Sequence, residues 1–335
     1  MPIDSDAQAV LDQFAKFKVP PIESMSPENA RNAPTLKNAV EEMTAESVTA
    51  RTATIAKPMP PPVGAITHQL IPGKGGDILA RVFTPDGDGP FPVLVYFHGG
   101  GWVIADLDVY EAACRTLCNE VEAVVVSVAY RQAPEHKYPA AVEDAYAATQ
   151  WVIENARQLN GDPSRVAVAG ESAGGNLAAV VCLKARAEGG RMPVAQLLVY
   201  PVTDARMNTA SYQENANAKP LNAAMMGWFW KHYLENESQG REPYASPMMA
   251  RDLAGLPPAI VITAESDPLR DEGEAYAKRL ADAGVSVKSR RFDGVMHEFF
   301  GLAGVVDKAT EAVTEATEGL NRVFKASSSV APSGG

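Results

Sequence analysis

Cysteine is scarce in this sequence, which has only three, Cys114, Cys118 and Cys182, in 335 residues. An odd number of cysteines argues against a disulfide framework and is typical of a reducing compartment. Cys114 and Cys118 could share one helix face, but no third or fourth cysteine or histidine follows at the spacing of a metal site. We therefore expect three buried structural thiols and no metal.

Basic charge is also in short supply: 30 Lys and Arg stand against 41 Asp and Glu, and the formal net charge is −11. Nucleic acids and anionic membranes attract clustered Lys and Arg, so this composition argues against both partners. The sequence contains no run of about eighteen apolar residues, as a membrane-spanning helix would need. Its first residues lack the basic and apolar segments of a signal peptide. We expect a soluble, cytoplasmic protein.

Internal repeats are absent too, and low-complexity sequence occurs only near the end, so we expect residues 326–335 to be a disordered tail. Residues 1–50 contain two helical segments, Ala7–Phe17 and Pro27–Thr44, the second introduced by Ser26 as a cap. Consecutive prolines between residues 57 and 63 exclude a helix there, because proline lacks an amide donor. We interpret this stretch as a linker into the main domain.

The rest of the chain alternates between short apolar runs and longer helical segments. A hairpin comes first, with strands Ile66–Ile71 and Asp77–Phe83 around a glycine-rich turn, and it predicts an antiparallel edge. The later strands are expected at Pro92–Phe97, Ala123–Ala129, Val166–Ala169, Gln196–Tyr200, Ala259–Ala264 and Val285–Phe292. The helices between them are expected at Tyr110–Asn119, Ala140–Ala156, Asn176–Glu188 and Gly273–Ala283. This pattern predicts an α/β protein whose mostly parallel sheet of about eight strands is flanked by helices.

One connection, residues 204–256, is too long for a plain crossover. It contains the apolar, helix-like stretch from Met225 to Trp230. We interpret it as an inserted part of a helical cap, to which residues 1–50 contribute the other part. Residues 51–203 and 257–325 then form the main domain.

The most informative motif is Gly170-Glu-Ser-Ala-Gly174, which lies between a predicted strand and a predicted helix. Glycines on both sides permit a tight strand-to-helix turn that exposes the Ser172 hydroxyl. The positive end of the following helix points to the same place. This context favours Ser172 as a nucleophile, with the Ala173 amide as an oxyanion donor.

A second motif, His98-Gly-Gly-Gly-Trp102, directly follows a predicted strand. Three glycines let the backbone come close to a substrate and direct amides at an oxyanion. A flexible loop and a phosphate-binding loop are the alternatives. The sequence lacks the Lys-Ser/Thr ending of a P-loop, which argues against phosphate.

A serine nucleophile needs a base that is neutral near pH 7, and histidine is the natural choice. Of the five histidines, four lie in the glycine loop, the hairpin, a turn and the insertion, which leaves His297 after the last strand. An acid must then orient the imidazole. Glu265, Asp267 and Asp271 follow one strand, and we favour Asp267 because it lies just past the strand end, before a proline.

From Pro92 to Phe300 the chain resembles the bacterial esterases related to hormone-sensitive lipase. The resemblance rests on both glycine motifs and on the order Ser172, Asp267, His297, which is that of the α/β-hydrolase fold. Further matching motifs are Tyr130-Arg-Gln-Ala-Pro-Glu135, Tyr138-Pro-Ala-Ala141, Tyr200-Pro-Val-Thr-Asp204 and Asp267-Pro-Leu-Arg-Asp271. It implies the α/β-hydrolase fold with a helical cap. It also implies that Ser172 is the nucleophile, His297 the base and Asp267 the acid, and that Gly99, Gly100 and Ala173 are the oxyanion donors.

Two positions depart from the family pattern, which more often has Asp where Glu171 stands and Leu where Gln132 stands. Glu171 either braces neighbouring loops or occupies the surface. A substrate pocket is expected to include some aromatic and methionine side chains, although such residues also fill cores. The candidates are Trp102, Tyr200, Met225, Trp228 and Phe229.

These observations predict a serine carboxylesterase for short- to medium-chain acyl esters that works through an acyl-enzyme, with no metal and no organic cofactor. An amidase such as an arylformamidase would use the same residues and stays open. A non-catalytic receptor on this fold is expected to lose the base, so His297 argues against it. A structural protein gives no reason for the motifs to coexist. The expected partner is a small ester, and the family resemblance suggests a homodimer.

Overall fold

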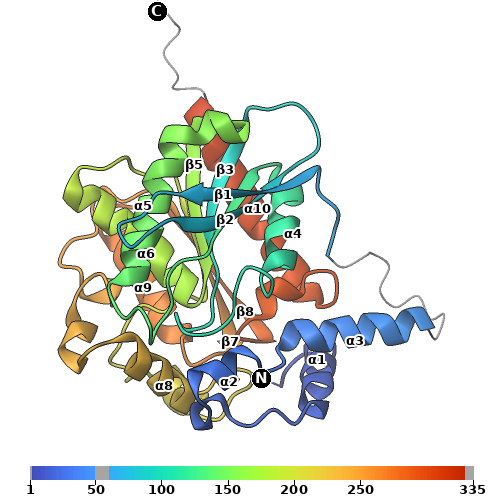
Figure 1. Ribbon diagram of the computed structural model, residues 1–335. Coiled ribbons are helices and arrows are strands. Elements are labelled where there is room, and N and C mark those ends of the chain that lie inside the picture. The colour runs from blue at the N-terminus through green and yellow to red at the C-terminus, as the bar shows by residue number, and fades with distance from the viewer. Residues whose placement is uncertain (1, 50–59, 329–335) are drawn as a thin grey trace, which may run out of the picture.

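The computed structural model describes residues 2–49 and 60–328, and it contains one eight-stranded sheet (Figure 1). The strands are β1 (Ala65–Ile71), β2 (Ile78–Thr84), β3 (Phe91–Phe97), β4 (Val124–Val128), β5 (Gly161–Glu171), β6 (Gln196–Val199), β7 (Ala259–Ser266) and β8 (Val287–Met296). Their order is β1-β2-β4-β3-β5-β6-β7-β8. β1 pairs antiparallel with β2, and β2 with β4, whereas the other neighbours are parallel. The antiparallel edge and the mostly parallel sheet are confirmed.

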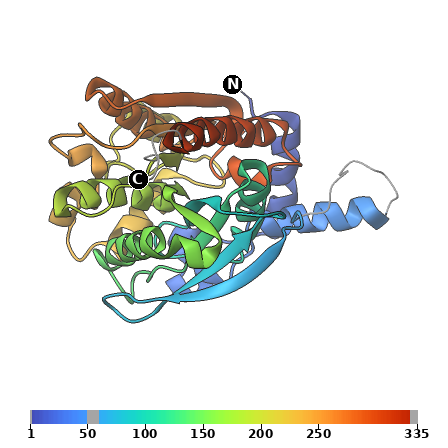
Figure 2. The ribbon, with the colours of Figure 1, turned by 90° about the horizontal axis from the view of Figure 1, so that it is seen from above.

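Helices cover both faces of the sheet, because alternate residues of a strand point to opposite sides. In β3, Val93 and Val95 pack into the core under α5 (Ala140–Asn155), α6 (Ala173–Glu188) and α9 (Arg270–Asp282). Leu94 and Tyr96 pack into the core under α4 (Glu111–Val121) and α10 (Asp307–Ser328). Figure 2 shows α10, in dark red, and the light blue β1–β2 hairpin at opposite sides of the molecule.

The N-terminal region and the insertion lie together at one end of the molecule (Figure 1). The N-terminal part contains α1 (Ser5–Lys16), a short turn η1 (Ile22–Ser24), α2 (Pro27–Arg31) and α3 (Leu36–Thr49). The insertion contains α7 (Ala210–Glu214), α8 (Ala223–Tyr233) and two short turns, η3 (Glu237–Arg241) and η4 (Pro247–Met249). α8 contacts η1, so the two parts meet.

The single helix expected from Pro27 to Thr44 is wrong, because the structure has two helices there, α2 and α3. Pro34 has no amide donor, and the residue before a proline disfavours helical torsion angles. Thr35 immediately precedes α3, and its amide donates to the side-chain oxygen of Asn38 in that helix at 2.9 Å. The expected N-terminal capping of the helix by Ser26 is confirmed, since the Ser26 side chain accepts a hydrogen bond from the amide of Asn29 at 3.3 Å.

The C-terminal region differs more from expectation. The last strand runs from Val287 to Met296 rather than from Val285 to Phe292, and the long helix α10 has no counterpart among the expected elements. Its buried face is rich in alanine, which weakens the apolar signal: Ala309, Ala312, Val313, Ala316, Leu320 and Phe324. Because α10 continues to Ser328, a disordered tail from residue 326 is wrong for residues 326–328. Residues 329–335, like the linker residues 57–59, lie outside the described residues.

The three cysteines are free and buried, as expected. Among the helices of the described part of the chain, none combines the length and the apolar character needed to cross a bilayer.

Candidate active site

Ser172 occupies a strained turn between β5 and α6. Its backbone has φ 56° and ψ −118°, a combination that residues other than glycine rarely adopt. The turn is also too tight for neighbouring side chains: a Cβ on Gly170 would lie 2.2 Å from the Gly174 carbonyl oxygen, and one on Gly174 would lie 1.9 Å from that of Phe97. The Ser172 amide donates to the Val199 carbonyl at 2.9 Å. The two glycines and β6 therefore hold the serine at the carboxyl end of the sheet.

The glycine loop after β3 is packed just as closely. Gly100 and Gly101 have φ of 90° and 58°. A Cβ on Gly101 would lie 2.1 Å from the ring of Phe229 in α8, so the insertion rests directly on the loop. A Cβ on Gly99 would lie 2.3 Å from the hydroxyl oxygen of Tyr110, on the other side. The loop is a fixed wall rather than a flexible connection.

His98, the first residue of the glycine motif, supports the loop through contacts with Tyr130. Its ring stacks on Tyr130 with centroids 4.4 Å apart, and the Tyr130 hydroxyl donates to the His98 carbonyl at 2.8 Å. Burial lowers the pKa of His98 to about 4. His98 is therefore neutral near pH 7, and its role here is to support the loop.

His297 lies against Asp267. The distance from His297 Nδ1 to Asp267 Oδ2 is 2.6 Å, and the other oxygen of Asp267 accepts from the Leu269 amide at 2.8 Å. Both side chains are buried. Burial by itself lowers the pKa of His297, but the charge and hydrogen bond of Asp267 raise it above 6.5 in net effect.

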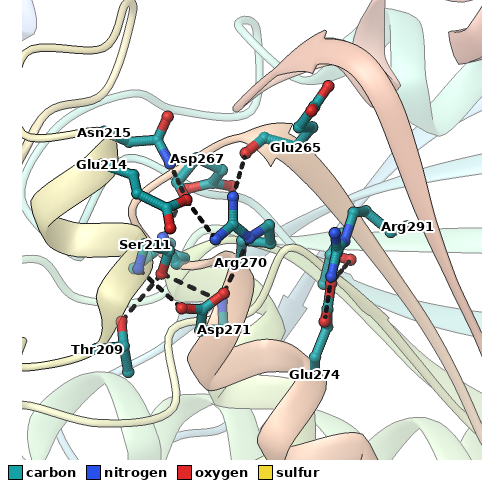
Figure 3. Close-up of polar contacts among 12 residues, drawn as sticks. Thr209, Ser211, Glu214, Asn215, Glu265, Asp267, Arg270, Asp271, Glu274 and Arg291 are labelled. Carbon is teal, nitrogen blue, oxygen red and sulfur yellow. Dashed lines mark hydrogen bonds and ion pairs between the residues drawn. The ribbon is translucent and has the colours of Figure 1, made fainter. Parts of the chain in front are cut away.

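The two other acids of this segment have different contacts. Asp271 accepts from the amide of Ser211 at 2.7 Å and pairs with Arg270, so it ties the insertion to α9 (Figure 3). Glu265 accepts from the Gly294 amide at 2.8 Å. Asp267 is thus the acid of the three that contacts His297 in the described structure.

Ser172 and His297 line one cavity of about 110 Å³, here called the Ser172 cavity. Gly100 and Gly101 form part of its wall. The remaining wall comes from the N-terminal part and from the insertion, including Phe14, Ile22, Leu36, Leu221, Met225 and Phe229. Both parts of the expected cap therefore enclose the serine.

Of the five residues expected in a substrate pocket, Met225 and Phe229 line this cavity. They are four positions apart on α8 and so share one helix face. Trp102, Tyr200 and Trp228 are not among the residues that line it. Trp102 is fully buried and stacks on Tyr233 with centroids 4.0 Å apart, because its bulk fills the core behind the glycine loop.

Tyr200 and Trp228 also pack against other side chains instead of lining the cavity. The ring of Tyr200 lies beneath His297, with centroids 4.5 Å apart, and is fully buried. Trp228, three positions after Met225 on α8, packs against His232, with centroids 4.4 Å apart. Both are packing residues whose aromatic character alone made them candidates.

Glu171 is buried, so a surface role is wrong. Its carboxylate accepts hydrogen bonds from the hydroxyls of Tyr96 in β3 and Tyr200 after β6, as a bracing role requires. Burial raises the pKa of Glu171 to about 7, although the two tyrosine hydrogen bonds lower it in part.

Sequence reasoning missed Glu298, which directly follows His297 and lines the same cavity. Its backbone has φ 67°, and burial raises the pKa of its carboxyl. The only signal in the sequence was its position beside His297.

Comparison with known proteins agrees with this geometry. Residues 94–301 match a family described as alpha/beta hydrolase fold. The carboxylic ester hydrolase LipN of Mycobacterium tuberculosis is 47% identical over 71% of this chain and 65% of its own length. The carboxylesterase NlhH of the same organism is 44% identical over 75% of this chain and 80% of its own. A hyperthermophilic esterase from the archaeon Pyrobaculum calidifontis has a TM-score of 0.83 and 39% identity, covering 96% and 99% of the two chains.

The chain belongs to the α/β-hydrolase fold family. Within it, the chain is an esterase of the group related to hormone-sensitive lipase.

Proposed function

We propose that this esterase hydrolyses short- to medium-chain acyl esters with Ser172 as nucleophile, His297 as base and Asp267 as the acid that orients it. The observation that carries the proposal is one juxtaposition: Ser172 and His297 line a single cavity, and Asp267 lies 2.6 Å from His297. A strained serine, a buried imidazole and a buried carboxylate at one cavity suit acyl transfer.

In the first step, His297 takes the proton of Ser172 as the serine oxygen attacks the ester carbonyl. Asp267 fixes the proton-bearing nitrogen of the imidazole and stabilises its charged form. The oxyanion that forms is stabilised by the backbone amides of Gly99, Gly100 and Ala173, of which the last begins α6. His297 then donates its proton to the departing alcohol.

In the second step, His297 activates a water molecule, which attacks the acyl-enzyme and releases the acid. Every proton in this cycle passes through one imidazole, so the proposal needs no metal or organic cofactor. The small volume of the Ser172 cavity, about 110 Å³, supports a preference for short acyl chains.

The proposal is tested with a panel of esters of increasing acyl length beside matched amides, for the wild type and for Ser172→Ala. Ester hydrolysis by the wild type and its loss in a folded Ser172→Ala variant are expected. A folded variant that hydrolyses esters at the parent rate would exclude Ser172. Faster hydrolysis of the amides, including formylated aryl amines, would favour the amidase alternative.

We further propose, on the acidic net charge and the three free cysteines, that the enzyme works in the cytoplasm without nucleic acid or membrane partners. On the family resemblance we propose a homodimer. Cell fractionation and light scattering of the purified protein test these points, and a membrane-bound or monomeric protein would contradict them.

A further inference from the structure

A second and larger cavity, of about 710 Å³, lies beside the Ser172 cavity. It is bounded by α3, by the start of α4 and by the short turn η5 (Phe299–Leu302), and Val40, Tyr110 and Leu302 are among its lining residues. We call it the Tyr110 cavity. Its volume is within the range of about 300–1,000 Å³ that is typical of small-molecule sites.

The two cavities are neighbours at the reacting residues. Thr35, Leu36 and Glu298 line both of them. The Tyr110 cavity is also lined by Glu171. Glu171 precedes the nucleophile and Glu298 follows the base, so the larger cavity begins next to the site of chemistry.

The cavities also lie on two sides of the glycine loop. Gly100 and Gly101 face the Ser172 cavity. Gly99 lies against the hydroxyl of Tyr110, whose side chain lines the larger cavity. An ester whose carbonyl oxygen faces the loop amides therefore has one cavity available for its acyl part and another for its alcohol part.

We propose that the Tyr110 cavity binds the alcohol part of the ester and that Glu171 and Glu298 make it selective for alcohols with a cationic group. This inference rests on the proposed function. The acyl part stays on Ser172 after the alcohol leaves, so it occupies the cavity that Ser172 lines. The alcohol arm then extends into the larger cavity.

Charge is the reason for the selectivity. In the described part of the chain, Glu171 and Glu298 form no ion pair with a lysine or arginine, and their hydrogen bonds come from tyrosine hydroxyls. The cavity's other acids are compensated: Glu111 lies 2.6 Å from Arg81 and from Arg115, and Glu41 lies 3.7 Å from Lys37.

A cationic alcohol would supply the missing positive charge. Burial raises the pKa of both carboxyl groups, which reflects the cost of their negative charge without a counterion. The aromatic ring of Tyr110 offers the same cation a favourable face. A neutral alcohol of the same shape would gain neither interaction.

The experiment compares two acetate esters of the same shape, acetylcholine and 3,3-dimethylbutyl acetate, which differ in one positive charge. The readout is the ratio of their kcat/KM values, because a general effect on catalysis cancels in it. The wild type is expected to prefer the cationic ester about ten-fold, the equivalent of one desolvated cation contact. Glu298→Gln and Glu171→Gln should each lower the ratio several-fold toward one. Glu298 is only partly buried, so its variant stays informative if the Glu171 variant does not fold.

Glu120→Gln is the matched control, since it removes the same charge from the end of α4 without touching the lining of either cavity. Glu120 is exposed, so the ratio should stay within about two-fold of the wild type. Equal rates for the two esters, or an unchanged ratio in Glu298→Gln, would overturn the inference. Hydrolysis of p-nitrophenyl acetate but of neither branched ester would overturn the alcohol site and leave the proposed function standing. A wild type that hydrolyses none of the three esters would overturn both.

Discussion

The ring of Tyr200 lies against the imidazole of His297, with centroids 4.5 Å apart. The hydroxyl of the same tyrosine donates a hydrogen bond to Glu171, the residue before Ser172. The base and the nucleophile turn are therefore linked through one buried aromatic side chain at the end of β6. A change in the charge of Glu171 is expected to reach His297, because the negative charge of Glu171 is among the causes that raise the pKa of His297.

The assignment of the acid can be tested with two variants of the same segment. Asp267→Asn should lower kcat by several orders of magnitude, because the amide no longer orients and stabilises the imidazole. Asp271→Asn should keep most of the activity, since Asp271 binds the Ser211 amide and Arg270 instead. Steady-state kinetics with one ester checks both. Greater damage from Asp271→Asn would show that the wrong acid was chosen.

Activity should rise with pH as His297 loses its proton. Asp267 raises the pKa of His297 above 6.5, so the midpoint of kcat/KM against pH should lie above 6.5. A neutral ester should be used, over a pH range in which circular dichroism reports an intact fold. A profile that is flat down to about pH 5 would contradict the role of His297 as base.

Glu171 should make stability depend on pH. Its pKa is about 7 in the folded protein and 4.5 as a free side chain, so the folded state holds the proton more tightly. The wild type should therefore lose unfolding free energy, relative to Glu171→Gln, as pH rises from 4.5 to about 7. Denaturant unfolding of both proteins across this range measures the difference. A difference that does not change with pH would show that the folded protein does not perturb Glu171.

The acyl-chain profile should reflect the wall of the Ser172 cavity. Each buried methylene contributes about 0.8 kcal/mol until the wall is reached, after which overpacking reverses the trend. We expect an optimum at roughly four to eight carbons and no activation at a lipid interface. A series of p-nitrophenyl esters and a triglyceride emulsion test this. A preference for long-chain emulsions, or an unchanged profile in a folded truncation after Ala50, would contradict it.

Arg31 anchors the N-terminal part to the main domain. Its guanidinium donates to the carbonyls of Val103 and Ala133 at 2.8 Å and pairs with Glu135 at 2.6 Å. Arg31→Ala should raise KM several-fold with a smaller effect on kcat, because α2 and the cavity wall next to it lose their attachment. The control is Arg157→Ala, which removes an exposed arginine in the short turn η2 (Ala156–Leu159) and should change neither constant. Equal KM values for both variants would exclude an anchoring role.

The local sequence was sufficient to predict the structure wherever a short motif determines its own backbone geometry. Gly170 and Gly174 marked the Ser172 turn because the backbone there has no room for a Cβ: one on Gly170 would meet the Gly174 carbonyl four residues on, although one on Gly174 would meet the distant Phe97. The order of Ser172, Asp267 and His297 indicated the fold, since parallel strands bring their carboxyl ends to one edge. The fold, the family and the esterase class followed from such signals. The catalytic roles remain predictions for the experiments above.

The same reasoning could not predict which side chains pack together when they are far apart in the sequence. Trp102 and Tyr200 are of residue types that often line pockets, yet both are buried against distant parts of the chain. Trp102 packs on Tyr233, more than a hundred positions away, and Tyr200 packs on His297, nearly a hundred positions away. Side-chain type reports only a tendency to be buried, not which surface buries it.

The sequence by itself determined the class of this protein. The glycine motifs and the strand pattern depend only on nearby residues, and the order of the three site residues along the chain can be read directly from the sequence. Only the tertiary structure decided which side chains share a cavity. Glu171 and Glu298 lie far apart in the chain and come to line one cavity because β5 and β8 end at the same edge of the sheet. The physical reason is that burial and charge compensation depend on every neighbour in space, and most of those neighbours are distant in sequence.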